Sequence, residues 1–239
     1  MMSSLKTIYK KELLGYFNSM IAYVVLTVYV VITNWLFLRG FFIINQANMR
    51  NYFSLLPWIF LFFVPAITMR LWSEERKSGT IELLLTFPIN DYEVVLGKYL
   101  AALTFLSIGL LLSFTIPITL LILGQPDIGV IIGGYLGALL LGAAYLSIGS
   151  YISSLTGNQI VSFILSVSVI FVLFLLGQNF FLYTMPAKLA PLFKYLGLGA
   201  HFDSVSRGVI DSRDIIYYLS VITLFLYFNV KFIESRKWK

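Results

Sequence analysis

Residues 128–187 form a run of 60 residues without a formal charge, and this run constrains the fold more than any other feature. A helix needs about 20 mostly apolar residues to cross a membrane, because each residue rises about 1.5 Å through a hydrocarbon layer about 30 Å thick. The run is therefore too long for one crossing and fits two. Small polar residues around Gly157 and Asn158, within 153–159, predict the turn between the two helices.

The composition of the whole chain is that of a membrane protein. Hydrophobic residues make up 59% and charged residues 12%, whereas soluble domains carry about 25% charged residues. Lys and Arg outnumber Asp and Glu by 17 to 11. No compact basic stripe with interleaved aromatic side chains accompanies this excess, so we expect no nucleic-acid partner. Because the chain contains no cysteine, it has neither disulfides nor thiolate metal ligands.

Four further apolar stretches predict four more spans, so we expect an all-α membrane protein with six transmembrane helices. These stretches lie at about residues 20–38, 51–69, 99–126 and 215–232. Pro117 lies deep in the third of the six spans and should kink it, because proline lacks a backbone donor. The predicted membrane domain covers residues 20–232 and includes an external loop at 183–214; a cytoplasmic tail follows at 233–239.

Residues 1–19 precede the first span and alternate basic with apolar positions. Lys6 and Lys10 interleave with Leu5 and Ile8, which predicts an amphipathic helix on the membrane surface. A cleaved signal peptide also begins with basic residues, but the apolar run that follows here is long and aromatic and lacks a small-residue cleavage site. An ordinary cytoplasmic tail is the alternative interpretation.

The distribution of basic residues predicts the orientation of the chain. Eleven Lys and Arg lie on the side that holds both termini and the polar segment 70–98, and six lie on the other side. Basic residues are enriched on the cytoplasmic side of membrane proteins. We therefore expect both termini and segment 70–98 in the cytoplasm.

Small residues recur every four positions in the predicted fourth span. Gly133 and Gly137 form one series, and Gly134, Ala138 and Gly142 form another. Residues four apart share one face of a helix, so each series allows a neighbouring helix to approach closely. Packing inside the bundle is the simplest interpretation; a face that lines the substrate path, or a seam with a second copy, is the alternative.

The sequence lacks the signatures of catalysis and of nucleotide binding. No phosphate-binding motif of the form Gly-x-x-x-x-Gly-Lys-Ser/Thr occurs. His201 is the only histidine, so no second histidine can share a metal with it. The deep parts of the predicted spans contain no Asp, Glu, His, Lys or Arg, which argues against an intramembrane protease and a relay of buried carboxylates. We expect no catalytic, cofactor or metal site in this chain.

Segment 70–98 is a dense polar insertion between two apolar stretches and holds nine of the 28 charged residues. Ser73 is expected to cap a first helical turn, because serine side chains accept hydrogen bonds from the free N–H groups of a helix start. Gly79 should interrupt this turn. A second, two-turn helix is predicted over residues 80–87 and should end at Pro88.

The same segment should end in a new helix, because Asn90 and Glu93 have the spacing of a capping box. The two-turn helix before it is marginal alone and should need packing against a partner. A membrane-surface loop whose Leu83, Leu84 and Leu85 dip into the interface is the alternative.

One part of segment 70–98 resembles a known family. Residues 73–88 are Ser-Glu-Glu-Arg-Lys-Ser-Gly-Thr-Ile-Glu-Leu-Leu-Leu-Thr-Phe-Pro, and Val-Leu-Gly-Lys follows at 95–98. This resembles the segment between the second and third spans of ABC-2 type transporter permeases, whose pattern is close to Glu-Glu-x-x-x-Gly-Thr-x-Glu-x-Leu-Leu-x-x-Pro, then Val-Leu-Gly-Lys. Residues 201–211 resemble the end of the family's external stretch, and the entry to the second span is similar to that of gliding-motility-associated (GldF-like) permeases.

The resemblance implies a permease subunit of an exporter, with no enzymatic activity of its own. Residues 74–88 would form a coupling helix in a cleft of a separate ATPase subunit, which binds ATP and Mg, and the N-terminal helix would brace it. The implied contact residues are Glu74, Glu75, Arg76, Lys77, Gly79, Thr80 and Glu82. Short re-entrant helices in the external loop would cap the exit.

The resemblance also implies further partners and a location. The chain would be half of a dimeric pore, formed with a second permease copy in a bacterial cytoplasmic (inner) membrane, with an accessory membrane or periplasmic subunit as a further partner. Two other functions stay open from the residues alone: a carrier that acts without an ATPase, and a non-transporting membrane anchor or assembly subunit. The uncharged interior specifies no substrate.

Overall fold

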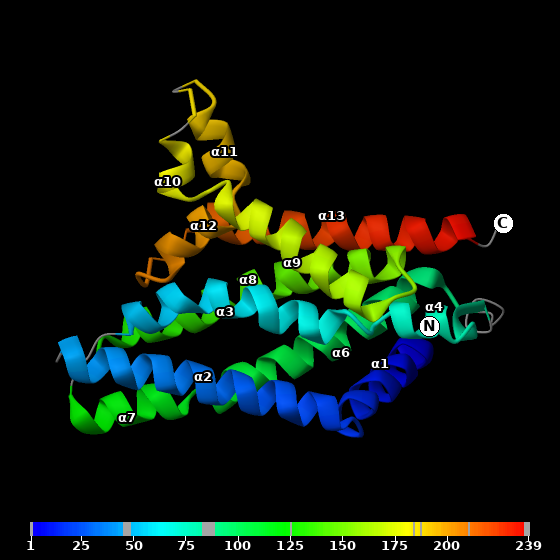
Figure 1. Ribbon diagram of the computed structural model, residues 1–239, viewed down its shortest axis with the longest axis horizontal. Coiled ribbons are helices and arrows are strands. Elements are labelled where there is room, and N and C mark those ends of the chain that lie inside the picture. The colour runs from blue at the N-terminus through cyan, green and yellow to red at the C-terminus, as the bar shows by residue number, and fades with distance from the viewer. Residues whose placement is uncertain are drawn as a thin grey trace.

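The chain forms a helical bundle in the computed structural model (Figure 1), which describes residues 2–44, 49–82, 89–124, 126–183, 185–186, 188–209 and 211–236. The long helices are α2 (Met20–Ile44), α3 (Arg50–Thr68), α6 (Asp91–Leu112), α8 (Ile128–Leu155), α9 (Gln159–Leu175) and α13 (Ser212–Arg236). The others are α1 (Met2–Phe17), α4 (Ser73–Lys77), α7 (Thr115–Leu123), α10 (Asn179–Leu182), α11 (Ala190–Leu196) and α12 (Leu198–Val205). Helix is the only regular secondary structure in these ranges, as the sequence predicts.

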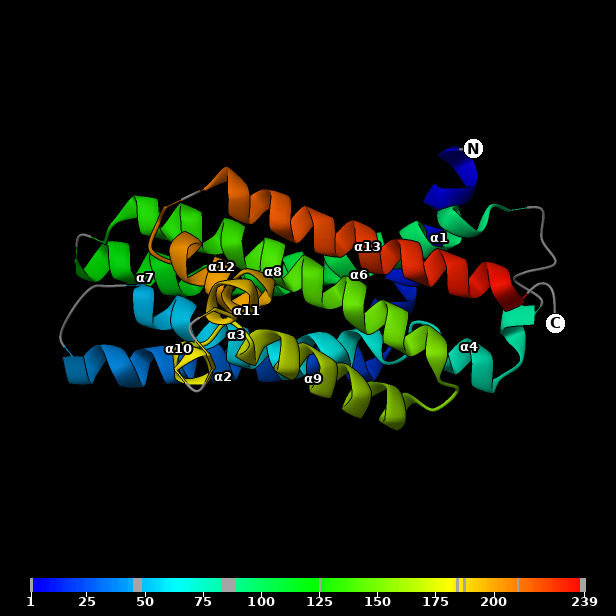
Figure 2. The same ribbon diagram turned by 90° about the horizontal axis from the view of Figure 1, so that it is seen from above.

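Helix α1, helix α4 and the end of α13 gather at one end of the bundle, which we call the α4 end (Figures 1 and 2). Helix α7 and the start of α3 lie at the opposite end. Helices α10 and α11 stand away from the long helices (Figure 1). The bundle therefore has one end built from segments that are far apart in the sequence.

Within the described ranges, five segments are long and apolar enough to cross a membrane, judged by length and composition. They are Met20–Phe41, Arg50–Lys77, Asp91–Leu123, Ile128–Leu155 and Ser212–Ser235. Helix α9 is also apolar but has 17 residues. The long uncharged run is thus divided between one full-length helix and one shorter one.

The predicted turn within this run is confirmed. Helix α8 ends at Leu155 and α9 begins at Gln159. The side chain of Asn158 caps α9 by accepting a hydrogen bond from the Ile160 backbone N–H (2.9 Å). Asparagine at this position is a favoured helix cap, so the local sequence itself explains the break.

The third predicted span contains a break where the sequence suggested only a kink. The helix does not run unbroken over 99–126 but stops between α6, which already begins at Asp91, and α7. Pro117 cannot donate to the Ser113 carbonyl four residues earlier, so the regular hydrogen-bond pattern fails there. The Ser113 carbonyl instead accepts from the Ile116 backbone N–H (3.1 Å) and from the Tyr135 hydroxyl (3.1 Å).

Helix α8 is the central element and packs against α3, α6, α9, α12 and α13. Two of its glycines lie where neighbours come closest. A Cβ atom at Gly134 would stand 2.2 Å from Phe53 Cε2 of α3, and one at Gly137 would stand 2.7 Å from Val205 Cγ1 of α12. The other small residues of the two series, Gly133, Ala138 and Gly142, are also buried. Helices can approach α8 this closely because these positions have little or no side chain.

Replacing Gly134 with Ala should destabilise the bundle by about 1–3 kcal/mol, because the added methyl group collides with the buried Phe53 ring. Gly40→Ala is the matched control, since a Cβ atom at Gly40 of α2 meets nothing within 4 Å. Alanine favours helix over glycine, so the control should be neutral or slightly stabilising. Unfolding of both purified variants in detergent measures the difference, and equal effects of the two substitutions would contradict the packing argument.

Candidate functional site

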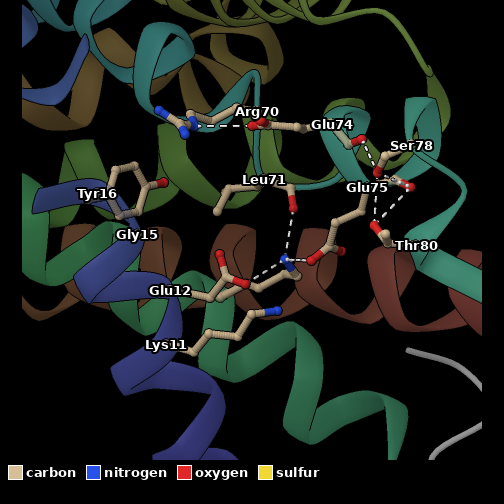
Figure 3. A pocket seen from close by; sticks show the side chains of 11 residues that line it. Lys11, Glu12, Gly15, Tyr16, Arg70, Leu71, Glu74, Glu75, Ser78 and Thr80 are labelled. Carbon is tan, nitrogen blue, oxygen red and sulfur yellow. Dashed lines mark hydrogen bonds and ion pairs between the residues drawn. The ribbon is translucent and has the colours of Figure 1, made fainter. Parts of the chain in front are cut away.

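Helices α1, α4 and α6 enclose a cleft at the α4 end of the bundle (Figure 3). Its volume is about 360 Å³. Charged and polar side chains dominate its lining, which consists of Lys11, Glu12, Gly15, Tyr16, Arg70, Leu71, Glu74, Glu75, Ser78, Thr80 and Lys98. The cleft joins the N-terminal helix to both ends of segment 70–98.

Lys98 of α6 is the buried centre of this site, with 1% of its side chain exposed. Its ammonium group donates to Glu12 Oε1 of α1 (2.9 Å), to Glu75 Oε1 of α4 (2.8 Å) and to the Leu71 carbonyl (2.9 Å). Figure 3 shows Glu12 and Glu75 converging from opposite sides. All three ammonium protons are used, and two carboxylates offset the buried charge. We call these four residues the Lys98 junction.

Trp72 connects the Lys98 junction to α8. Its indole ring is fully buried and lies 5.0 Å from Lys98 Nζ, within cation–π distance. The indole Nε1–H donates to Ser150 Oγ (3.3 Å), and the Trp72 backbone N–H donates to Ser153 Oγ (3.2 Å). Ser153 in turn donates to the Met69 carbonyl (3.2 Å). The link between α3 and α4 is therefore held against α8 through both side chains and backbone.

Two more contacts extend this network. The buried Asn229 of α13 donates through Nδ2 to Ser150 Oγ (2.9 Å), so Ser150 accepts from both Asn229 and Trp72. Arg76 of α4 donates to the Ser154 carbonyl near the end of α8 (2.8 Å). Polar contacts thus join α1, α4, α6, α8 and α13 at one end of the bundle.

Tyr16 fixes the end of α1 to the long helices. Its hydroxyl donates to the Ile67 carbonyl of α3 (3.0 Å), and its ring stacks on Phe105 of α6 with 4.8 Å between ring centres. Burial raises the pKa of the Tyr16 phenol, and the negative charge of Glu12 acts in the same direction. The phenol therefore stays neutral and remains a donor. Helix α1 packs against α6 as part of the bundle.

The seven predicted contact residues fall into two groups. Glu75 and Arg76 point inward, because Glu75 pairs with Lys98 and Arg76 donates to α8. The exposed residues are Glu74, Lys77, Gly79, Thr80 and Glu82. Gly79 has a φ of 71°, in the left-handed region that favours glycine, which explains why the helix is interrupted there.

Part of segment 70–98 lies outside the described residues. Residues 80–82 are helical, whereas 83–88 lie outside the description. The remainder of the predicted two-turn helix, its stop at Pro88 and the alternative interfacial loop at Leu83, Leu84 and Leu85 all fall there.

Two predicted caps in this segment are wrong in atomic detail. Ser73 is the first residue of α4 and not its cap, because its buried hydroxyl donates back to the Met69 carbonyl. Asn90 precedes α6 as predicted, but its side chain makes no capping hydrogen bond. The Ser73 backbone N–H donates to Ser153 Oγ of α8 (3.3 Å), so a tertiary contact takes the place of a local cap at the start of α4.

A second buried polar cluster lies where α12 meets the start of α13. His201 Nδ1 lies 2.7 Å from Asp214 Oδ1, and His201 Nε2 lies 2.9 Å from the Tyr195 carbonyl. Ser204 donates to the other carboxylate oxygen of Asp214 (2.7 Å). The Tyr217 ring stacks on the imidazole with 3.9 Å between ring centres.

This cluster joins helices and does not have the geometry of a catalytic triad. In a nucleophilic triad the hydroxyl is hydrogen-bonded to the imidazole, which takes its proton. Here Ser204 bonds to Asp214, and Nε2 of His201 faces a carbonyl oxygen, which can only accept. The Nε2–H therefore donates to that carbonyl. The cluster holds α11, α12 and α13 together.

Replacing Asp214 with Asn should loosen this cluster, because it removes the negative charge that faces His201 and accepts from Ser204. Hydrogen bonds to charged groups contribute about 1.5–3 kcal/mol each. We expect faster amide hydrogen exchange over Leu198–Val205 and a lower unfolding free energy. Asp203→Asn, at an exposed position of α12, is the control and should leave exchange unchanged. Unchanged exchange in the Asp214 variant would refute the assignment.

The sequence interpretation missed the roles of Lys98 and Trp72. Both lie in segment 70–98, but no local pattern links Lys98 to Glu12, 86 residues earlier. The available signal was a lysine inside the apolar start of a membrane helix, where a charge requires a partner. Trp72 gave no comparable signal, because its serine acceptors lie in an uncharged helix.

Comparison with protein families places the chain. The model of a family described as ABC-2 family transporter protein matches residues 41–228, more than three quarters of the chain. The matched region includes Lys98, Trp72 and the His201 cluster, whereas Glu12 and the rest of α1 precede it. No curated protein matches the chain significantly.

Proposed function

Because the chain belongs to the ABC-2 family of transporter proteins, we propose that it is the transmembrane permease subunit of an ABC exporter. In this proposal it moves a substrate across the membrane with energy from ATP hydrolysis in a separate ATPase subunit. The chain is a multi-pass membrane protein, and the members of its family are transport components that are not themselves catalytic. ATP and Mg would be bound by the partner ATPase.

The proposed topology has six membrane crossings with both termini in the cytoplasm. Helix α9 would be the short crossing, because its 17 residues extend roughly 25 Å against a hydrocarbon layer of roughly 30 Å. Bilayers thin locally around short spans at modest cost. The excess of Lys and Arg on the side of α1, α4 and the end of α13 supports a cytoplasmic location for the α4 end.

The observation that carries this proposal is the exposed polar surface of α4 and the residues after it. Glu74, Lys77, Thr80 and Glu82 are exposed at the end of a bundle whose other surfaces are largely apolar. A polar surface at this place suits a soluble partner, and in this family the normal partner is an ABC ATPase. We propose that these residues contact the ATPase subunit as a coupling segment, while Glu75 and Arg76 hold it in place.

A second permease copy would complete the pore. The bundle leaves large apolar side chains exposed along α2 and α9, including Val24 and Trp35 (60% each) and Ile160 (70%). In the proposed arrangement these faces meet lipid or the second copy. Closure of two ATPase subunits on ATP would draw the two coupling segments together and tilt the attached helices.

Reversing two exposed charges, Lys77→Glu together with Glu82→Lys, should weaken capture of the ATPase subunit roughly tenfold, because charge complementarity at an interface would be lost. The affinity-tagged chain is purified from its native membrane, and co-purified ATP hydrolysis is measured. Arg213→Glu reverses an exposed charge at the start of α13, away from α4, and is the control.

An equal yield of ATPase from the double variant and the control would refute the contact assignment. Absence of an ATP-hydrolysing subunit from the unaltered chain would refute the exporter proposal itself. Substrate transport by the chain alone in vesicles would instead support a carrier that needs no ATPase.

A further inference from the structure

The Lys98 junction and Trp72 together connect five helices at the α4 end, namely α1, α4, α6, α8 and α13. Lys98 joins α6 to Glu12 of α1 and to Glu75 of α4. Trp72, at the start of α4, joins this junction to Ser150 of α8. Asn229 adds α13 through the same serine. A displacement of α4 therefore cannot occur without moving these contacts or breaking them.

The contacts differ from the packing in the rest of the bundle in one physical respect. Dispersion contacts between apolar helix faces are individually weak and nondirectional. A buried ammonium group with three acceptors has fixed geometry, and loss of one partner leaves an uncompensated charge in a medium of low polarity. The Lys98 junction therefore resists the relative motion of α1, α4 and α6 far more than the apolar contacts do.

Close backbone packing supports the same conclusion for α1. A Cβ atom at Gly97, the residue before Lys98, would stand 2.9 Å from Ile8 Cγ2 of α1. Helix α1 therefore lies directly on α6 beside the ion pairs. In α4, Glu75 is engaged in the junction and Glu74 pairs with Arg70 (3.4 Å), whereas Lys77 is exposed.

We propose that Lys98 is a positioning residue that fastens α1, α4 and α6, and through Trp72 also α8 and α13, into one rigid unit that transmits displacement of α4. This inference rests on the proposed function for the source of the displacement, a partner ATPase. The rigidity itself is a property of this chain alone. The two parts can therefore be tested separately.

The test variant replaces all three charged side chains by neutral ones of similar size: Lys98→Met, Glu12→Gln and Glu75→Gln. Lys98→Met alone would leave two carboxylates without their counter-charge and disturb folding, whereas the triple variant removes the whole charge cluster. The control is Lys231→Met with Glu234→Gln, which neutralises an exposed ion pair at the same end of the bundle.

The chain contains no cysteine, so spin labels can be placed at chosen positions without background. Lys10→Cys on α1 and Ser235→Cys on α13 are both exposed. Pulsed electron paramagnetic resonance then measures the α1–α13 distance in the permease alone. We expect one narrow distribution for the unaltered junction and for the control. For the triple variant we expect a broadened distribution and roughly tenfold faster amide exchange in α1.

The second arm uses the complex with its ATPase, without nucleotide and after trapping with ATP and vanadate. With the junction intact, the α1–α13 distance should not change on trapping, because the unit moves as a whole. In the triple variant the ATPase should still co-purify and hydrolyse ATP, but trapping should shift the distance. A residue needed only for folding would instead lower the yield of complex.

A narrow, nucleotide-independent distance in the triple variant would overturn the proposal, and so would a distance that shifts on trapping with the junction intact. If the unaltered chain retains no ATPase, the proposed function fails together with the transmission role. The distance distribution of the permease alone still decides whether Lys98 fastens the helices. Failure of the function and failure of the fastening are therefore distinguishable.

Discussion

The buried ammonium group of Lys98 is the interaction on which the α4 end of this protein depends. An isolated buried charge costs several kcal/mol, so this lysine is tolerated in α6 only where acceptors converge on it. Its three acceptors come from α1, from the link between α3 and α4, and from α4 itself. None of these segments can satisfy the charge alone. Their placement is therefore cooperative, and a five-residue helix such as α4, too short to be stable in isolation, gains a fixed position.

Helix α8 organises the rest of the bundle with two different chemistries along its length. Toward α7 it carries glycines, so that α3 and α12 approach its backbone closely. Toward α4 it carries buried serines, among them Ser150 and Ser153, whose hydroxyl groups accept from Trp72. Small residues serve both purposes, because glycine permits close packing and serine adds a hydrogen-bond partner at little extra volume. Helix α8 has no charged residue and still positions a polar network.

Much of this architecture could be predicted from the sequence because hydrophobicity over about 20 residues is a local property. The helical class, the break at Asn158 and the interruption at Gly79 all follow from residues within a few positions of each feature. The atomic contacts between helices do not follow from neighbouring residues in this way. Ser73 is a good cap by local rules, but its backbone N–H donates to Ser153 of α8, and Lys98 pairs with Glu12 across 86 residues. Partners that far apart are chosen by the packing of helices, which no window along the sequence contains.

The two inward residues of α4 explain how one short helix can be fixed to the bundle and still present exposed charges at its surface. Successive residues of a helix point in different directions, so Glu75 and Arg76 can be committed to Lys98 and α8 while Lys77 is exposed. In the proposed function the exposed Lys77 is available to a partner, because the inward side already supplies the attachment. A force applied to the outward side is then carried by directional, buried contacts. In the proposed exporter the apolar helices beyond them would follow, so that a membrane interior without charges would still respond to a protein outside it.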